Sequence, residues 1–155
     1  MTIEDDIAFF ERVPTLGLLG RDALRILAIG AESRYVHGGE KLFGVGDEAD
    51  AGYVIQEGSF SLATGVAEEA EPMVVGRGTL IGELALITET TRPATATARE
   101  PSTVLRIPRS LFLKMLDGFP NAALRLRELL MSRASQATAE VYSVRRGILD
   151  ESDGG

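Results

Sequence analysis

The chain has 155 residues, of which 45% are hydrophobic and 25% are charged, a balance typical of one globular domain with a real core. A net charge of −7 with scattered basic residues argues against a nucleic-acid partner, and no apolar run approaches the length of a membrane helix. With no cysteine, disulfides and iron–sulfur ligation are excluded. The single histidine, His37, cannot form a metal site without several carboxylates, and the sequence shows no such cluster. The acidic N-terminus does not resemble a secretory or transit peptide, so we expect a cytoplasmic location.

Two helices are predicted before residue 33. Thr2 suits the N-cap of a first helix that reaches Arg12, because acidic residues follow it and Pro14 then stops the helix. A second helix is expected over residues 20–32, where the apolar residues Leu24, Leu27 and Ala28 form a stripe.

From residue 33 the pattern changes to short runs rich in aromatic and β-branched residues, with glycines between them. Strands are expected at residues 34–36, 40–43, 52–57, 59–62, 73–75, 94–99 and 102–107. Short strands at this spacing predict an antiparallel β-roll or jelly roll. With helices before and after it, the fold class is α+β and mainly β.

The C-terminal part is predicted to be helical. A short amphipathic helix spans Arg109–Gly118, and Asn121 can cap a long helix that reaches about Arg145. One apolar stripe follows this helix, formed by Leu126, Leu130, Ala134, Ala137, Val141 and Val144. The stripe packs either on the β-roll or on a second subunit. Residues 149–155 are polar and are expected to form a flexible tail.

Several arginines are interpreted as ordinary charges. Arg133 belongs to a loose row of arginines on the long helix and is assigned to a solvated face or to pairing with nearby glutamates. Arg106 and Arg109 flank the end of a strand and are expected to be surface charges.

Residues 82–95 carry the clearest chemistry, since they place a carboxylate and a guanidinium on either side of a short turn. Gly82 permits an unusual φ or a close approach, and the residues after it suit about one helical turn, whose first N–H groups have no partner. Glu83 can accept hydrogen bonds from ribose hydroxyls, and Arg92 presents planar donors that suit a phosphate. Together they could bind a sugar phosphate.

The run G-E-L-A-L-I-x-x-x-x-R-x-A-T at residues 82–95 resembles the phosphate-binding cassette of cyclic nucleotide-binding domains. These domains occur in cyclic-nucleotide-dependent kinases, gated channels and the bacterial catabolite-activator and Fnr regulators. Two earlier runs, G-E-x-L-F-x-x-G-D and Y-V-I-x-x-G, are similar to the β-roll of the same family. The resemblance implies one domain over residues 1–148, with N-terminal helices at 1–32, a β-roll at 33–107 and C-terminal helices at 109–148.

The resemblance implies a receptor for cyclic AMP, or for cyclic GMP, without enzymatic activity, cofactor or metal. Glu83 would accept from the ribose 2′-hydroxyl, and Arg92 would pair with the cyclic phosphate. Gly82 would allow close approach, and the backbones of Ala85 and Ala94 would donate to the phosphate. Apolar residues would enclose the base, namely Val75, Ile81 and Leu84.

Two hydroxyl residues have alternative readings. Thr95 would contact guanine, or it is a strand threonine with good β propensity. Thr138, on the long helix, would contact adenine, or it faces solvent. The resemblance also implies a homodimer through the long helix and a signal carried by that helix. The chain stops without a helix-turn-helix region, so we expect the output to reach a separate protein partner.

Pro93 departs from the family pattern. Family members commonly bind the phosphate through the N–H of the residue after the arginine, and proline has no N–H. Losing one charge-assisted bond costs about 1.5–3 kcal/mol, unless the stiffer loop recovers part of it. The alternative is therefore a β-roll that no longer binds ligand and acts as a protein-interaction module. A third reading, a cupin-like enzyme, needs several histidines, and the chain has one.

Overall fold

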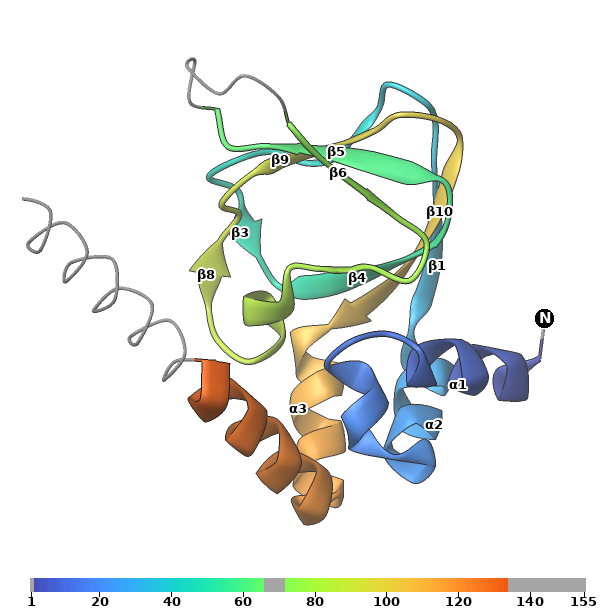
Figure 1. Ribbon diagram of the computed structural model, residues 1–155, viewed down its shortest axis with the longest axis vertical. Coiled ribbons are helices and arrows are strands. Elements are labelled where there is room, and N and C mark those ends of the chain that lie inside the picture. The colour runs from blue at the N-terminus through green and yellow to red at the C-terminus, as the bar shows by residue number, and fades with distance from the viewer. Residues whose placement is uncertain (1, 66–71, 134–155) are drawn as a thin grey trace, which may run out of the picture.

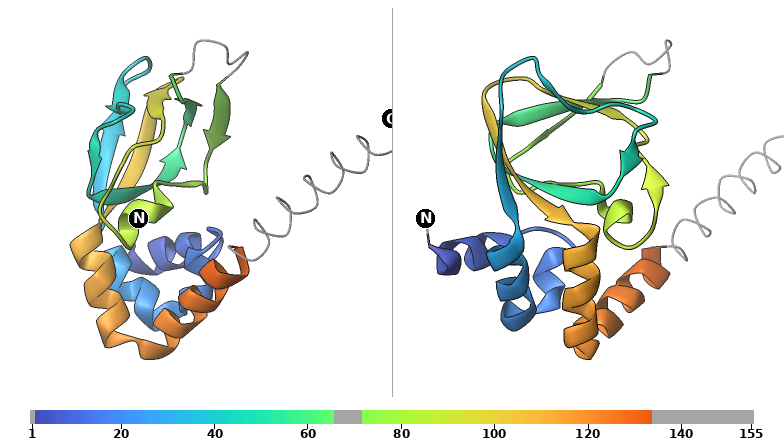
Figure 2. Two further views of the ribbon diagram at one scale, coloured as in Figure 1. Left: turned by 90° about the vertical axis from the view of Figure 1, so that its left-hand side faces the viewer. Right: turned by 180° about the vertical axis from the view of Figure 1, so that it is seen from behind.

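The computed structural model describes residues 2–65 and 72–133 and shows a β-roll standing on a layer of helices (Figure 1). The layer lies at one end of the roll in all views (Figure 2). It contains the helices α1 (Ile3–Glu11), α2 (Arg21–Gly30) and α3 (Arg109–Gly118), the 3₁₀ helix η1 (Leu16–Leu19), and a last helix that covers residues 120–133 of the described chain.

Two four-stranded antiparallel sheets form the roll, in the orders β1-β10-β4-β7 and β2-β9-β5-β6, and a short β3-β8 ribbon joins them. A second 3₁₀ helix, η2 (Glu83–Leu86), follows β7. The strands are β1 (Glu32–Val36), β2 (Lys41–Phe43), β3 (Glu48–Ala49), β4 (Ala51–Glu57), β5 (Ser59–Ala63), β6 (Met73–Gly76), β7 (Leu80–Ile81), β8 (Thr90–Thr91), β9 (Thr95–Ala98) and β10 (Ser102–Pro108). The predicted β-roll with flanking helices is confirmed.

The predicted start of α1 is confirmed by a capping box. The hydroxyl of Thr2 accepts from the backbone N–H of Asp5 at 3.1 Å, and the Asp5 carboxylate accepts from the Thr2 N–H at 3.1 Å. These bonds favour the ionised carboxylate and lower the pKa of Asp5. The second predicted helix ends earlier than expected, at Gly30, because Glu32 already pairs with Arg106 at the start of β1.

The last helix begins differently from the prediction. It already includes Pro120, so Asn121 is not its N-cap. Proline is favoured at the first helical position, where its missing N–H leaves nothing unpaired. Leu126 is 4% exposed and packs into the core beneath the roll, with Leu130 against it. This part of the predicted stripe therefore faces its own chain, while the rest of the stripe and Thr138 lie outside the described residues.

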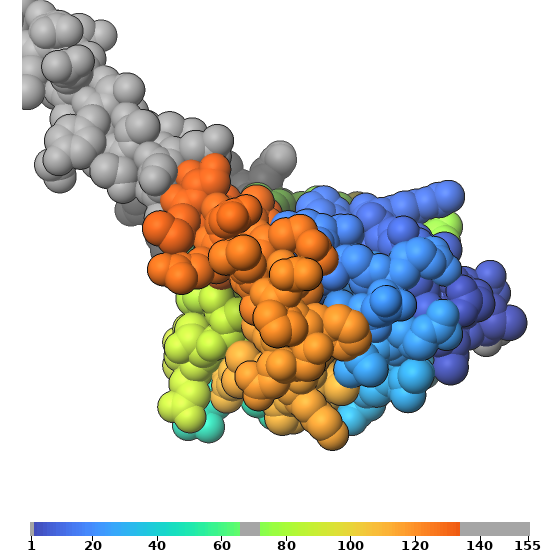
Figure 3. Space-filling model, turned by 90° about the horizontal axis from the view of Figure 1, so that it is seen from below, coloured from blue at the N-terminus to red at the C-terminus, as the bar shows by residue number. Residues whose placement is uncertain are grey.

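The core has two parts because β4 alternates its side chains between two faces. Val54 faces the helices and packs with Phe10, Leu24 and Phe112, whereas Tyr53 and Ile55 face the interior of the roll. From below, the C-terminal helices lie between the N-terminal helices and the yellow-green segment around β8 (Figure 3). Of the helices described, none is both long and apolar enough to cross a bilayer.

Candidate functional site

The backbone of Arg92 is fixed by the glycine-rich turn after β2. The N–H of Arg92 donates to the carbonyl of Asp47 at 2.8 Å, and the N–H of Gly46 donates to the carbonyl of Arg92 at 2.8 Å. Asp47 closes its own turn by accepting from the N–H of Gly44 at 2.8 Å. Gly46 has a φ of +86°, a conformation that favours glycine. The G-x-G-D part of the sequence thus positions the arginine of the cassette.

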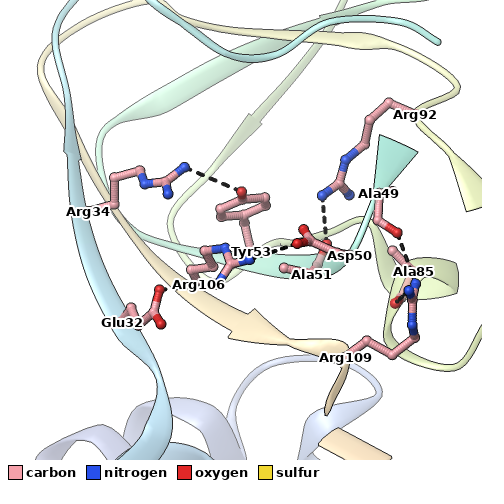
Figure 4. A network of polar contacts seen from close by, with 10 residues as sticks. All are labelled: Glu32, Arg34, Ala49, Asp50, Ala51, Tyr53, Ala85, Arg92, Arg106 and Arg109. Atoms are coloured by element: carbon pink, nitrogen blue, oxygen red, sulfur yellow. Dashed lines mark hydrogen bonds and ion pairs between the residues drawn. The ribbon is translucent and has the colours of Figure 1, made fainter. Parts of the chain in front are cut away.

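The side chain of Arg92 points into the roll and is 4% exposed. Its guanidinium carbon lies 4.3 Å from the ring centroid of Phe43 and 5.4 Å from that of Tyr53, and both rings can stabilise a cation. Nη2 donates to the carbonyl of Ala51 at 2.8 Å (Figure 4). Nε and Nη1 are buried and have no hydrogen-bond partner among the residues described.

The surroundings of the Arg92 guanidinium also shift its pKa. Burial lowers the pKa of Arg92, and the nearby Tyr53, Asp50 and Asp47 only partly oppose this effect. The pKa of an arginine starts so high that the group keeps its charge at neutral pH. A buried cation with two unpaired donors is costly unless an anion approaches it.

Gly82 places the cassette directly against this guanidinium. It has φ +80° and ψ +36°, the left-handed conformation, and precedes η2. A Cβ atom at this position would collide with Nη1 of Arg92. The turn differs from the prediction at Ala85, whose N–H donates to the carbonyl of Gly82 at 3.1 Å. The 3₁₀ geometry closes hydrogen bonds over three residues, so this amide gains a partner inside the turn.

Glu83 contacts two residues that the sequence did not indicate. Its Oε2 accepts from the hydroxyl of Thr15 at 2.7 Å, and its Oε1 pairs with Nη1 of Arg133. Nη2 of Arg133 also donates to the hydroxyl of Thr15, at 3.0 Å. Arg133 is therefore not only a charge on a solvated helix face, because its contact with Glu83 links the last helix to the cassette.

The other predicted residues divide between the interior and the surface. Ile81 is 7% exposed and packs inside the roll with Val75 beside it. Leu84 is 56% exposed, although it was expected to help enclose a base. The hydroxyl of Thr95 accepts from the N–H of Val45 at 2.9 Å. Pro93 and Ala94 form the bend between Arg92 and β9.

Arg106 and Arg109 are not the free surface charges that were expected. The side chain of Arg106 is 17% exposed and pairs with Glu32 and Asp50, each at 3.1 Å (Figure 4). Although burial alone would lower the pKa of Arg106, its contacts with Tyr53, Asp50 and Glu32 raise it. Strand pairing in the roll brings these partners together, and no local pattern reveals it.

Arg109 bridges the helical layer and the cassette. From the start of α3, its Nη1 donates to the carbonyls of Ala49 at 2.9 Å, Thr88 at 3.0 Å and Ala85 at 3.3 Å. One guanidinium thus holds the end of η2 and the loop after it against β3. Across the described ranges, no group of three or more histidine, cysteine or acidic residues could hold a metal ion.

The sequence and the fold match known proteins. The family model described as "cyclic nucleotide-binding domain" matches residues 33–119, more than half of the chain. A cyclic nucleotide-binding-like protein from Brucella abortus is 37% identical, with 73% of this chain and 98% of that one covered and a TM-score of 0.65. The N-terminal domain of a transcriptional regulator from Streptomyces coelicolor is 27% identical, with 86% and 94% covered and a TM-score of 0.78.

A curated relative, the lysophospholipase NTE1 of Chaetomium globosum, is 32% identical over 122 residues. The alignment covers 76% of this chain but only 8% of that enzyme, so the similarity concerns one segment of a much longer protein. The family match runs from the second residue of β1 to the residue after α3 and includes every cassette residue described above. The chain therefore belongs to the cyclic nucleotide-binding domain family.

Proposed function

We propose that this domain is a receptor that binds a 3′,5′-cyclic nucleotide, with cyclic AMP preferred, in the roll interior beside the cassette. One observation carries the proposal: Arg92 is buried, and its Nε and Nη1 have no hydrogen-bond partner within residues 2–65 and 72–133. A cyclic phosphate has one negative charge and two free oxygens, so it can accept from an unpaired donor of this guanidinium and neutralise the cation. Phe43 and Tyr53 both pack against the guanidinium, and neither ring accepts a conventional hydrogen bond from its unpaired donors.

The surrounding residues suit the rest of such a ligand. Gly82 lets the cassette backbone come close to the guanidinium, and Glu83 can accept from the ribose 2′-hydroxyl. The backbone of Ala94 would donate to the phosphate, and Ile81 with Val75 would contact the base. The hydroxyl of Thr95 already accepts from the Val45 amide, so one of its two lone pairs is used. A guanine amino group would have to share this oxygen with that amide, so the contact gives cyclic GMP less advantage than a free hydroxyl would.

The same contacts suggest how the signal would leave the site. Arg133 joins Glu83 to the last helix, so a ligand that shares Glu83 would change the balance between two positions of that helix. In our proposal the moving helix acts on a partner protein, or on a second copy of the chain, in the cytoplasm. Size-exclusion chromatography with and without cyclic AMP would reveal a dimer and any dependence on ligand.

Calorimetric titration of ligand-stripped protein with cyclic AMP and cyclic GMP, run side by side, tests the proposal. We expect saturable binding that favours cyclic AMP and that is lost in Arg92→Ala. Arg99→Ala is a matched control, because it removes an exposed arginine from the turn after β9. No saturable heat with either nucleotide up to millimolar concentration would contradict the proposal, and so would an Arg92→Ala variant that binds like the parent.

A second candidate function is protein interaction without a ligand. Three observations favour it: both carboxylate oxygens of Glu83 have partners, the Ala85 amide is bonded within η2, and Pro93 has no N–H. A partner protein captured with equal affinity in the presence and absence of cyclic nucleotides would support this alternative, provided that titration also shows no binding.

A further inference from the structure

Thr15 has a backbone conformation that its side chain disfavours. Among the residues described, it is the one non-glycine residue with positive φ, at φ +77° and ψ −50°. These angles lie near the rare γ-turn region, which is strained for any side chain and most of all for a β-branched one. Glycine would adopt them at lower cost. Strain of this kind persists where the surroundings hold the residue in place, and it often marks a functional position.

The hydroxyl of Thr15 shows what holds it. The side chain is buried, with 6% of the residue exposed. It donates to Glu83 Oε2 at 2.7 Å and accepts from Arg133 Nη2 at 3.0 Å, while Nη1 of Arg133 pairs with the other oxygen of Glu83. One hydroxyl therefore joins three segments that are far apart in the sequence: the link before η1, the cassette and the last helix.

We propose that Thr15 is a positioning residue that holds the Glu83 carboxylate in the orientation needed by the ribose 2′-hydroxyl; this inference rests on the proposed function. A carboxylate can accept about four hydrogen bonds. Thr15 and Arg133 use one on each oxygen and fix the rotamer, and the remaining lone pairs can accept from the ligand. A carboxylate fixed before binding loses less conformational freedom when the ligand arrives, so it binds more tightly.

The role also explains the strained backbone. The link between α1 and η1 must bring a hydroxyl to the partly exposed carboxylate of Glu83, and a glycine there would relax the chain but supply no hydrogen bond. Serine would supply the hydroxyl without the β-branch, and valine would keep the shape without the hydroxyl. These two substitutions separate the hydrogen bond from the backbone geometry.

The test is titration of the parent, Thr15→Val and Thr15→Ser with cyclic AMP and with 2′-deoxy cyclic AMP, which lacks the hydroxyl that Glu83 would bind. We expect Thr15→Val to bind cyclic AMP about five- to tenfold more weakly, as for the net loss of one ordinary hydrogen bond, because the lost bond positions Glu83 and does not itself contact the ligand. Its affinity for 2′-deoxy cyclic AMP should change by less than about twofold, because Thr15 and the 2′-hydroxyl are coupled only through Glu83. Thr15→Ser should restore cyclic AMP binding to near the parent value.

Thr15→Gly provides a second readout, because it removes the hydroxyl and relieves the strain together. Its melting temperature should equal or exceed that of the parent, while its affinity for cyclic AMP should fall as in Thr15→Val. Equal losses of affinity for both nucleotides in Thr15→Val, or cyclic AMP binding in Thr15→Gly that matches the parent, would overturn the proposed role of Thr15. Neither result would overturn the proposed function. A parent protein that binds neither nucleotide would overturn the proposed function, and this inference with it.

Discussion

Arg92 and Arg109 are both held by backbone carbonyls in the same part of the molecule, but their donors are used in opposite ways. Nη1 of Arg109 reaches three carbonyl oxygens within 3.3 Å and ties α3 to the cassette. Arg92 is more deeply buried, reaches one carbonyl, and leaves Nε and Nη1 without a partner in the described part of the structure. The difference is visible in Figure 4, where Arg109 points at Ala49 and Ala85 and Arg92 at Ala51 alone.

This contrast distinguishes a structural arginine from one that is suited to a ligand. A guanidinium whose donors are satisfied stabilises the fold and gains little from an anion. A buried guanidinium with unpaired donors destabilises the free protein and gains much from one. Removing Arg109 should therefore affect stability, and removing Arg92 should affect binding.

The largest expected effect is on ligand binding by Arg92→Leu. Two charge-assisted bonds to the phosphate would disappear, so we expect cyclic AMP affinity to fall by at least about 100-fold. Thermal stability should stay level or rise, because an unpaired buried charge is replaced by an apolar side chain beside Phe43 and Tyr53. Calorimetry and thermal melts measure the two effects. A clear loss of stability with unchanged binding would reverse the assignment.

Arg109→Leu should show the opposite pattern. It leaves three backbone carbonyls without their shared donor, and such a loss destabilises by about 1–3 kcal/mol. Urea denaturation would measure it as a lower midpoint with an unchanged slope. Cyclic AMP bound by the folded variant should weaken far less than in Arg92→Leu. If Arg109→Leu is as stable as the parent, the prediction is wrong. Water would then replace the guanidinium as hydrogen-bond donor to the three carbonyls at no cost in free energy.

The fold could be predicted from the sequence because its longer elements have clear patterns. The capping box at Thr2 and the bounds of α3 are visible in neighbouring residues, and glycine turns mark most strands. β3, β7 and β8 have two residues each, too few for any alternation to show. The 3₁₀ helix η1 was missed because four residues are also too few for a helical period.

The site was predictable only where it is local. Gly82, Glu83 and Arg92 belong to one short stretch, so their chemistry can be read together. Their partners are distant in sequence: the carbonyl that Arg92 contacts is 41 residues away, and Thr15 and Arg133 are separated by 118 residues. Such contacts depend on how β4 and the last helix pack. A buried hydroxyl at Thr15 has no signature beyond its place after Pro14.

A smaller effect is expected where the cassette lacks a donor. Pro93→Ala adds a backbone N–H beside Arg92, at an exposed position in the bend before β9. If the amide reaches the phosphate, affinity for cyclic AMP should rise by about tenfold. The more flexible loop loses more conformational entropy on binding, which reduces this gain. Combining Pro93→Ala with Arg92→Leu should abolish the gain. A gain that survives without Arg92 would place the new donor away from the phosphate.

The smallest effect is expected for Arg106→Gln, which distinguishes a paired arginine at the rim of the roll from one in its interior. Its partners are well exposed, with 59% of the Glu32 side chain and 71% of the Asp50 side chain accessible. Solvent screens such pairs, so the loss of stability should stay below about 1 kcal/mol. It should shrink further in 1 M salt, because the screening length then falls to about 3 Å.

Affinity of Arg106→Gln for cyclic AMP should change by less than about threefold, because both guanidinium nitrogens of Arg106 that reach a carboxylate are already used. Denaturation at low and high salt, with calorimetry on the same samples, measures both quantities. A loss of affinity as large as that of Arg92→Leu would show that the phosphate senses the whole arginine cluster, and the contrast between satisfied and unsatisfied donors would no longer explain the site.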